Sequence, residues 1–203
     1  MNFLAHSLLG FDDSALVAGQ FCGDFVRGSD LSRFPAGIER GIRLHRYLDR
    51  YADTYEPLQA SRQKMNDLPR RFSGIVVDVL FDHFLANHWE QVSDISLSEH
   101  AQNVHRDLRL HEPILPDSLK RFMDALEEHD ILVNNRFLPS IEYTLLRLSK
   151  RSPRFSPLAI NQEQLKVLTE SLHDSFVGFY PKLNQAAVDY LADNPLTGEH
   201  SGE

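Results

Sequence analysis

Acidic and imidazole side chains occur at helical spacing in segments that are otherwise apolar. Asp78 and Asp82 lie four residues apart among valines, leucines and phenylalanines, and His83 follows directly. At about 100° of rotation per residue, side chains four positions apart share one face of a helix. Two buried carboxylates on one face would cost several kcal/mol in desolvation and mutual repulsion unless a positive charge neutralises them. The pattern therefore predicts a bound divalent cation.

The same mismatch occurs in a second segment, at His45 and Asp49. A helix expected over about 35–53 places both residues on the apolar stripe that contains Ile38 and Ile42, while most of its arginines point away from that stripe. The buried face of this helix therefore also offers an imidazole and a carboxylate one turn apart. These are two of the commonest metal-binding groups in proteins.

Two further candidates lie nearer the N-terminus. On the helix expected from residue 14, Asp24 lies on the same side as Val17 and Phe21. His6 interrupts the apolar segment at the start of the sequence. The candidate metal ligands are His45, Asp82, His83, Asp24, Asp49 and Asp78. Imidazole and carboxylate without thiolate suit Mn²⁺, Mg²⁺, Fe²⁺ or Zn²⁺ and favour the harder ions. For each residue taken alone a structural role is the alternative, because a lone buried histidine is commonly bonded to a carbonyl group and a single aspartate can pair with a neighbouring arginine.

The periodicity of the chain predicts helices that would carry these residues. They are expected at about 14–27, 35–53, 57–66, 70–92, 96–110, 116–129, 139–150 and 162–193, the last broken near Pro181. The segment 70–92 is apolar around nearly its whole circumference, which is typical of the central helix of a bundle. A strand over 74–80 would have no partner, because nothing else alternates with period two. The expected fold class is an all-α helical bundle.

Composition limits the remaining possibilities. With 203 residues, 42% of them hydrophobic, the chain fits one domain, which we expect over 1–194 with an unpacked tail over 195–203. No apolar run is long enough for a membrane span, and 29 acidic against 21 basic residues disfavour nucleic acid or an anionic membrane as partner. A single cysteine and an opening segment without a positively charged start favour the cytoplasm over secretion.

Four blocks of the sequence resemble, in order, those of the acyl carrier protein phosphodiesterases. The blocks are residues 2–6, 23–28, 41–49 and 78–85. The resemblance implies a bundle like that of divergent HD-domain phosphohydrolases. It also implies hydrolysis of the phosphodiester between 4′-phosphopantetheine and the serine of holo acyl carrier protein, with Mn²⁺ or Mg²⁺. The chain departs from the usual HD pattern, because Arg46 rather than aspartate follows His45 and the acid precedes the histidine at Asp82–His83.

This chemistry suggests roles for further side chains. Phosphodiester hydrolysis needs a metal-activated water and groups that neutralise the phosphoryl oxygens. The candidate catalytic residues are Asp24, Arg46, His6 and Arg27, of which either arginine could hold phosphate oxygens. The carrier protein implied by the resemblance is acidic, so docking on this net-negative chain would need a local basic cluster. The densest basic run consists of Arg147, Lys150, Arg151 and Arg154, and the alternative for it is a solvated surface.

Three other functions remain open on the sequence. An HD-like phosphohydrolase acting on a nucleotide or another small phosphoester would need the same metal site and no protein dock. A di-iron bundle would need paired Glu-x-x-His motifs, and only Glu170–His173 has that spacing. A non-catalytic helical adaptor would use its buried acids structurally, and would neither bind nor need a divalent ion.

Overall fold

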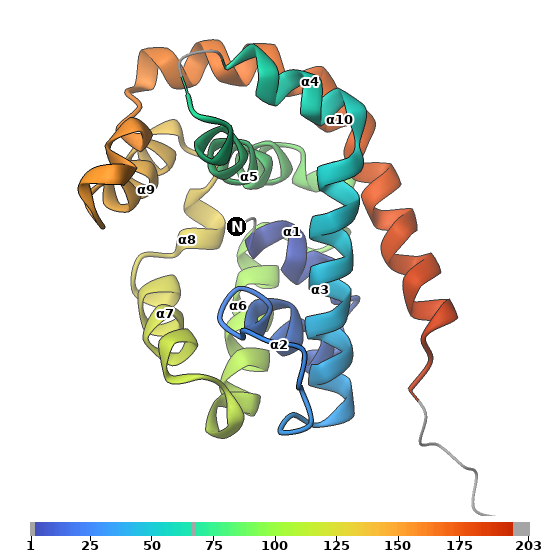
Figure 1. Cartoon of the computed structure of the whole chain (residues 1–203). Coiled ribbons are helices and arrows are strands. Elements are labelled where there is room, and N and C mark those ends of the chain that lie inside the picture. Colours follow the sequence, from blue (N-terminus) through green and yellow to red (C-terminus); the bar gives the residue numbers. More distant parts are fainter. Residues whose placement is uncertain (1–2, 66–67, 197–203) are drawn as a thin grey trace, which may run out of the picture.

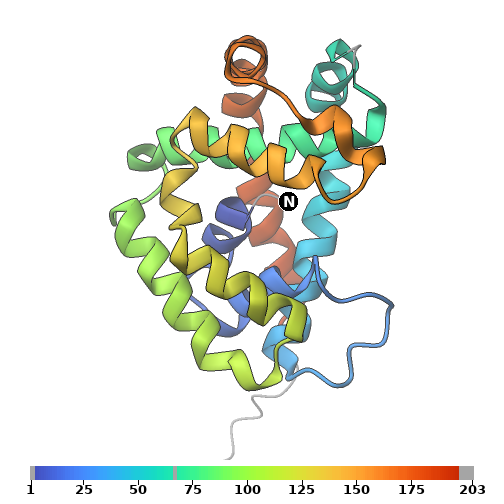
Figure 2. The same cartoon turned by 90° about the vertical axis from the view of Figure 1, so that its left-hand side faces the viewer.

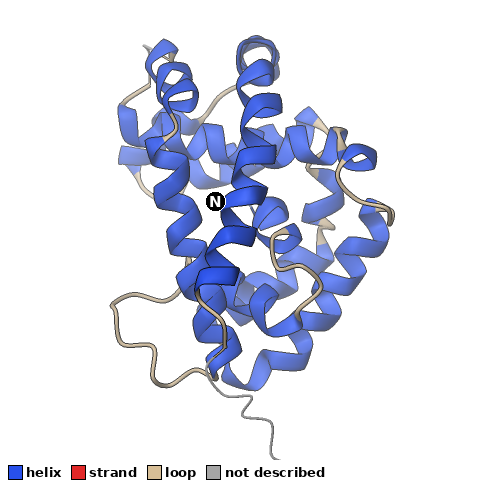
Figure 3. Cartoon of the chain, turned by 90° about the vertical axis from the view of Figure 1, so that its right-hand side faces the viewer, coloured by secondary structure: helices blue, strands red, loops and turns tan. Residues whose placement is uncertain are grey.

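The computed structural model describes residues 3–65 and 68–196, and all regular structure within them is helical (Figures 1 and 3). The all-α fold class is therefore confirmed. No helix in this described part is long and apolar enough to cross a membrane. The expected tail falls mostly on residues 197–203, which lie outside the described residues.

The α-helices follow one another along the chain with short connections. They are α1 (Phe3–Leu8), α2 (Ser14–Cys22), α3 (Ala36–Thr54), α4 (Glu56–Lys64), α5 (Arg70–Asn87), α6 (Leu97–His111), α7 (Asp117–Glu128), α8 (Ile131–Asn134), α9 (Leu138–Ser149) and α10 (Gln162–Asp193). Short 3₁₀ turns lie at Trp89–Gln91, Glu112–Ile114 and Pro153–Leu158. Each helix expected from the sequence has a counterpart, whereas α1 and α8 were not predicted because they are too short to show a periodic pattern.

Two predicted helix ends and one predicted helix break were wrong. The helix from residue 14 ends at Cys22 instead of 27, because the chain turns there and the N–H groups of Phe25 and Val26 both bond to the carbonyl of Cys22 at 2.9 Å. The helix from residue 70 ends at Asn87, and a separate 3₁₀ turn follows it. The helix from residue 162 continues through Pro181. One proline costs a helix only one hydrogen bond and a kink, which packing on either side can offset.

Helix α5 occupies the centre of the bundle, as its apolar circumference predicts. Val76, Leu80 and Leu85 on different sides of it are all 0% exposed. The long helix α10 runs beside α3 and α4 on the outside (Figure 1). It packs Phe176 edge-on against Phe81 of α5, with 4.8 Å between ring centroids. The core is thus built around the helix that carries three of the predicted metal ligands.

Helices α2 and α3 pack with their backbones in close contact. A Cβ atom on Gly19 would clash with the carbonyl oxygen of Ile38, and one on Gly41 would clash with that of Leu16. Only glycine permits such an approach of two helices. This contact holds α3, which carries His45 and Asp49, at a fixed distance from the turn that follows α2.

The short helix α1 is anchored to α5 by the carboxylate of Asp82. Oδ2 accepts a hydrogen bond from the N–H of Leu4 at 3.0 Å and Oδ1 accepts one from Ala5 at 3.1 Å. Asp82 is only 4% exposed, and burial raises the pKa of its carboxyl to about 7 even though these two N–H groups act in the opposite direction. The buried acid is therefore satisfied by the first turn of α1, where orphan N–H groups and the helix dipole favour negative charge.

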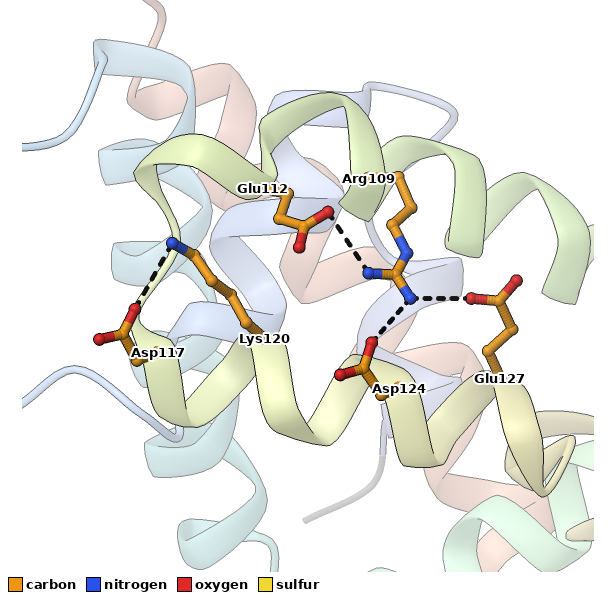
Figure 4. Close-up of polar contacts among 6 residues, drawn as sticks. All are labelled: Arg109, Glu112, Asp117, Lys120, Asp124 and Glu127. Carbon is orange, nitrogen blue, oxygen red and sulfur yellow. Dashed lines mark hydrogen bonds and ion pairs between the residues drawn. The ribbon is translucent and has the colours of Figure 1, made fainter.

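On the surface, one arginine ties α6 to α7. Arg109 contacts Glu112 at 3.3 Å, Asp124 at 2.9 Å and Glu127 at 3.0 Å (Figure 4). These three carboxylates raise the pKa of Arg109 further above its usual value. All four side chains are solvent-exposed by more than a third, so the network orients the two helices more than it stabilises them.

We expect Asp82→Ala to lower the free energy of unfolding by about 1–3 kcal/mol, because it leaves two N–H groups of α1 without their acceptor. Urea denaturation followed by circular dichroism measures this loss. Glu90→Ala removes an exposed acid shortly after the same helix and is the matched control. Equal stability of the two variants would contradict the anchoring role of Asp82.

Candidate metal centre

The structure gathers predicted residues from three segments into one cluster. His6 comes from α1, His45 and Asp49 come from α3, and Asp24 comes from the turn after α2. Nε2 of His6 lies 3.3 Å from Oδ1 of Asp49, and Nε2 of His45 lies 3.2 Å from Oδ2. Oδ1 of Asp24 lies 3.9 Å from Nε2 of His45. In the described part of the chain, His6, His45 and Asp49 form a group that could hold a metal ion, with ligand atoms within 4.8 Å of one another.

The cluster is closed on one side and open on the other. His6 is 4% and His45 2% exposed, and their rings stack with centroids 4.0 Å apart. The side chain of Asp49 is 54% exposed, so solvent reaches the cluster from its side. Gly23 makes room for the arrangement, because a Cβ atom at that position would overlap the ring of His45.

Gln20 fixes the orientation and protonation of His6. Nδ1 of His6 lies 2.9 Å from Oε1 of Gln20, and Nε2 of Gln20 donates to the carbonyl of Leu9 at 3.4 Å. The amide oxygen therefore faces His6, so Nδ1 carries the proton and donates it. Nε2 of His6 then presents its lone pair to a carboxylate oxygen of Asp49. A histidine that donates one ring N–H to a neighbouring acceptor and offers the other nitrogen is typical of metal sites.

Two facing acceptors repel each other unless a proton or a metal ion lies between them. Burial, and then the neighbouring His45 ring, lower the pKa of His6, which disfavours the proton. Burial raises the pKa of Asp49, but contacts that favour the ionised carboxylate, the largest of them with the ring of His45 at 3.2 Å, outweigh this, so the pKa lies below its usual range. At neutral pH the cluster thus contains a neutral imidazole and an ionised carboxylate, the forms that bind metals.

The donor set fits a divalent ion. Two imidazoles and up to two carboxylates suit Mn²⁺, Fe²⁺ or Zn²⁺. Among the described residues, Nδ1 of His45 is buried without a hydrogen-bond partner, and Nε2 of the same ring faces the carboxylate of Asp49. Ligand atoms separated by 3.2–3.9 Å can all contact one ion at metal–ligand distances of about 2.0–2.2 Å.

The three predicted ligands on α5 lie outside this cluster. Asp82 binds the N–H groups of α1, and Nδ1 of His83 lies 2.8 Å from the carbonyl of Asn135. Asp78 is half-buried on the same helix. The geometry therefore does not place Asp78, Asp82 or His83 with His6 and His45, and their role as metal ligands stays a prediction.

The two candidate phosphate-binding arginines have different surroundings. Arg46 donates to the carbonyl groups of Gly28 and Val26, each at 2.8 Å, and so holds the segment that follows Asp24. Arg27 is exposed in that same segment. Arg46 thus positions the turn, whereas Arg27 is an exposed residue three positions after Asp24.

The basic run predicted as a docking surface lies at the end of α9 and in the turn that follows. Its members, Arg147, Lys150, Arg151 and Arg154, are all exposed. The guanidinium of Arg147 lies 5.8 Å from the ring centroid of Tyr143, and that of Arg154 lies 5.3 Å from that of Phe155. We call these four exposed residues the basic edge, and two of its guanidinium groups are supported by aromatic rings.

Sequence reasoning missed two residues that shape the cluster, Gln20 and Gly23. Gln20 is 0% exposed although it is polar. The available signal was an amide within the apolar run of α2, which is the same kind of mismatch that identified His45. Gly23 had no comparable signal, because only the packed structure shows that the His45 ring occupies the space beside it.

Comparison with known proteins agrees with the resemblance of the four blocks. A family model described as "Acyl carrier protein phosphodiesterase" matches residues 1–183. The chain belongs to the acyl carrier protein phosphodiesterase family. The matched region contains every residue of the His6–His45–Asp49 cluster and the whole basic run on α9.

Individual members of the family match the chain over most of its length. A relative from Klebsiella pneumoniae is 34% identical, over 92% of this chain and 97% of its own length. Relatives from Escherichia coli and Salmonella agona are each 32% identical, over 92% and 93% of this chain and 97% and 98% of their own lengths. All three are named acyl carrier protein phosphodiesterase. No solved structure matches the chain.

We expect Gly23→Ala to weaken Mn²⁺ binding by about 10–100-fold, because the added methyl group displaces the ring of His45. Isothermal titration calorimetry measures the affinity, and a thermal melt verifies that the variant is folded. Gly74→Ala on α5 is the control, since a Cβ atom there meets nothing within 4 Å. Unchanged Mn²⁺ affinity in a folded Gly23→Ala protein would contradict a ligand role for His45.

Proposed function

We propose that the protein hydrolyses the phosphodiester bond between 4′-phosphopantetheine and the serine of holo acyl carrier protein. The products are apo acyl carrier protein and free 4′-phosphopantetheine. Membership of the family supports the reaction and the substrate. The observation that carries the proposal is the facing pair of His6 Nε2 and Asp49 Oδ1, because it supports a divalent ion at a position open to solvent.

The proposed ligands are His6, His45 and Asp49, with Asp24 beside them. When bound, a divalent ion supplies Lewis-acid chemistry by neutralising charge on the phosphoryl oxygens and lowering the pKa of a water molecule. The mixed donor set supports Mn²⁺ or Mg²⁺, and the two imidazoles favour Mn²⁺ of these two. Gln20 keeps His6 in the orientation and tautomer that the site requires.

The remaining side chains would position and neutralise the reacting groups. The carboxylate of Asp24, whose side chain is 25% exposed, is placed to accept the proton that the attacking water loses. Arg27 would bind a non-bridging phosphate oxygen, while Arg46 keeps the turn that carries both residues in place. The bond between phosphorus and the serine oxygen breaks, and that oxygen takes up a proton.

The surroundings of the cluster suit a substrate carried by another protein. Asp49 is the exposed member of the proposed ligand set, so a phosphodiester projecting from a protein surface can approach from that side. We also propose that residues 1–194 form one domain, because one hydrophobic cluster contains residues from α1 through α10. We propose the cytoplasm as the place of action, where the single buried cysteine stays reduced.

Incubation with holo acyl carrier protein and Mn²⁺ is expected to remove the 4′-phosphopantetheine mass, as followed by mass spectrometry. Asp49→Asn should lower the rate by at least about 100-fold, because it removes a charged ligand. Asp53→Asn changes an exposed acid one turn further along α3 and should leave the rate unchanged. Equal hydrolysis of a small phosphodiester and of the carrier protein would favour the small-phosphoester alternative.

Charge reversal within the basic edge on α9 tests the docking proposal. Lys150→Glu with Arg154→Glu should raise the KM for holo acyl carrier protein several-fold and leave kcat unchanged, because long-range attraction to an acidic partner is lost. The effect should shrink at high salt, where the Debye length falls to about 3 Å. Arg106→Glu with Lys166→Glu makes the same charge change at other exposed positions. If both double variants have the same KM for holo acyl carrier protein, this edge is not the docking surface.

A further inference from the structure

A cavity of about 470 Å³ lies between α5, α7, α8 and α9. Figure 2 shows this side of the molecule, with α7, α8 and α9 toward the viewer and α1 behind them. Its volume falls within the range of about 300–1,000 Å³ that is usual for small-molecule sites. None of the cluster residues His6, His45 and Asp49 lines it, so it is a separate feature of the fold.

The walls of the cavity are mainly apolar, with polar groups at separate points. Val79, Phe122 and Leu148 contribute apolar surface. Asn135, which is 7% exposed, and Asp82 are buried polar groups in the lining, and Ser140 and Thr144 of α9 add hydroxyl groups. Exposed Arg147 and Arg151 also line the cavity, so it reaches the basic edge. Apolar walls with a few convergent polar groups are typical of ligand sites.

Aromatic side chains connect this cavity to the metal centre. Phe3 lines the cavity three residues before His6, and Phe25 directly follows Asp24. The ring centroid of Phe3 lies 4.4 Å from that of Phe122 and 6.5 Å from that of Phe25. The segments that carry His6 and Asp24 therefore also carry Phe3, which lines the cavity, and Phe25, whose ring packs beside that of Phe3.

We propose that the cavity receives the pantetheine arm of the carrier protein's prosthetic group while its phosphate lies at the metal centre. This inference rests on the proposed function and deepens it. Pantetheine alternates short aliphatic stretches with a hydroxyl group and two amides, and the cavity alternates apolar walls with hydroxyl and amide side chains. Arg147 and Arg151 at the basic edge would contact the acidic protein from which the arm projects.

The competing occupant is a fatty acyl chain attached to the thiol of the arm. A purely aliphatic chain would cover the half-buried hydroxyl groups of Ser140 and Thr144 without offering them a hydrogen-bond partner, which costs free energy. Pantetheine offers amide and hydroxyl groups to these side chains. The polar groups of the lining therefore favour the arm itself over an acyl chain.

Binding of free pantetheine, which lacks the phosphate, tests the proposal without any catalysis. Nuclear magnetic resonance of the methyl groups should show saturable shifts at Val79, Ile131 and Leu148 in the wild-type protein, and none at Val167, which is exposed on α10. Absence of shifts at the cavity methyls would overturn the proposal. Shifts with octanoate but not with pantetheine would also overturn it, in favour of the acyl chain.

Filling the cavity provides the second measurement. Ala125→Trp from α7 and Thr144→Trp from α9 should each weaken pantetheine binding at least tenfold, whereas Glu128→Trp, exposed on α7, should not. The two filled variants should also lose efficiency on holo acyl carrier protein and keep their rate on bis(p-nitrophenyl) phosphate, which has no arm. Unchanged binding and kinetics in folded filled variants would overturn the proposal.

The two measurements separate this inference from the proposed function. Hydrolysis of holo acyl carrier protein without pantetheine binding at the cavity would refute the inference and leave the function in place. Pantetheine binding at the cavity methyls in a protein that does not hydrolyse holo acyl carrier protein would refute the function and support an arm-binding cavity. If a filled variant does not fold, the methyl shifts of the wild-type protein still show whether pantetheine binds in the cavity.

Discussion

Two hydrogen-bond acceptors, Nε2 of His6 and a carboxylate oxygen of Asp49, face each other at 3.3 Å at the edge of the core. Gln20 takes the only proton of the His6 ring, and burial disfavours a second one. Without a cation this contact is repulsive, and with one it joins α1 to α3. Two other contacts hold the helices that carry this pair. Asp82 anchors α1, and the glycine contacts hold α3 against α2.

The candidate site could be predicted in part from the sequence. The rule that acids and imidazoles on apolar helix faces need a partner identified His6, Asp24, His45 and Asp49, which the structure brings together. The same rule also selected Asp82, whose partner is the first turn of α1 rather than its fellow candidates. Periodicity shows which face of a helix is buried, but it does not show which buried faces meet. A backbone N–H group can satisfy a buried carboxylate and leaves no signal in residue types.

The fold was predictable where helices are long. Helix α3 follows from the spacing of its apolar residues, and the central helix α5 follows from its apolar circumference. Helices α1 and α8 have six and four residues, so they depend on tertiary packing rather than on a repeating pattern. The continuation of α10 through Pro181 also depends on packing. The cavity could not be predicted from residue spacing, because its wall combines side chains from five helices.

The most direct test of the metal centre is pulsed electron paramagnetic resonance of the Mn²⁺-loaded protein. Nitrogen couplings from two imidazoles are predicted, one of which disappears in His6→Ala while the other remains. In Gln20→Leu, which removes the acceptor for Nδ1, the His6 coupling should weaken or shift because the ring is no longer held. A Mn²⁺ signal without imidazole couplings, or no stoichiometric Mn²⁺ binding at all, would contradict a metal centre built on His6, His45 and Asp49.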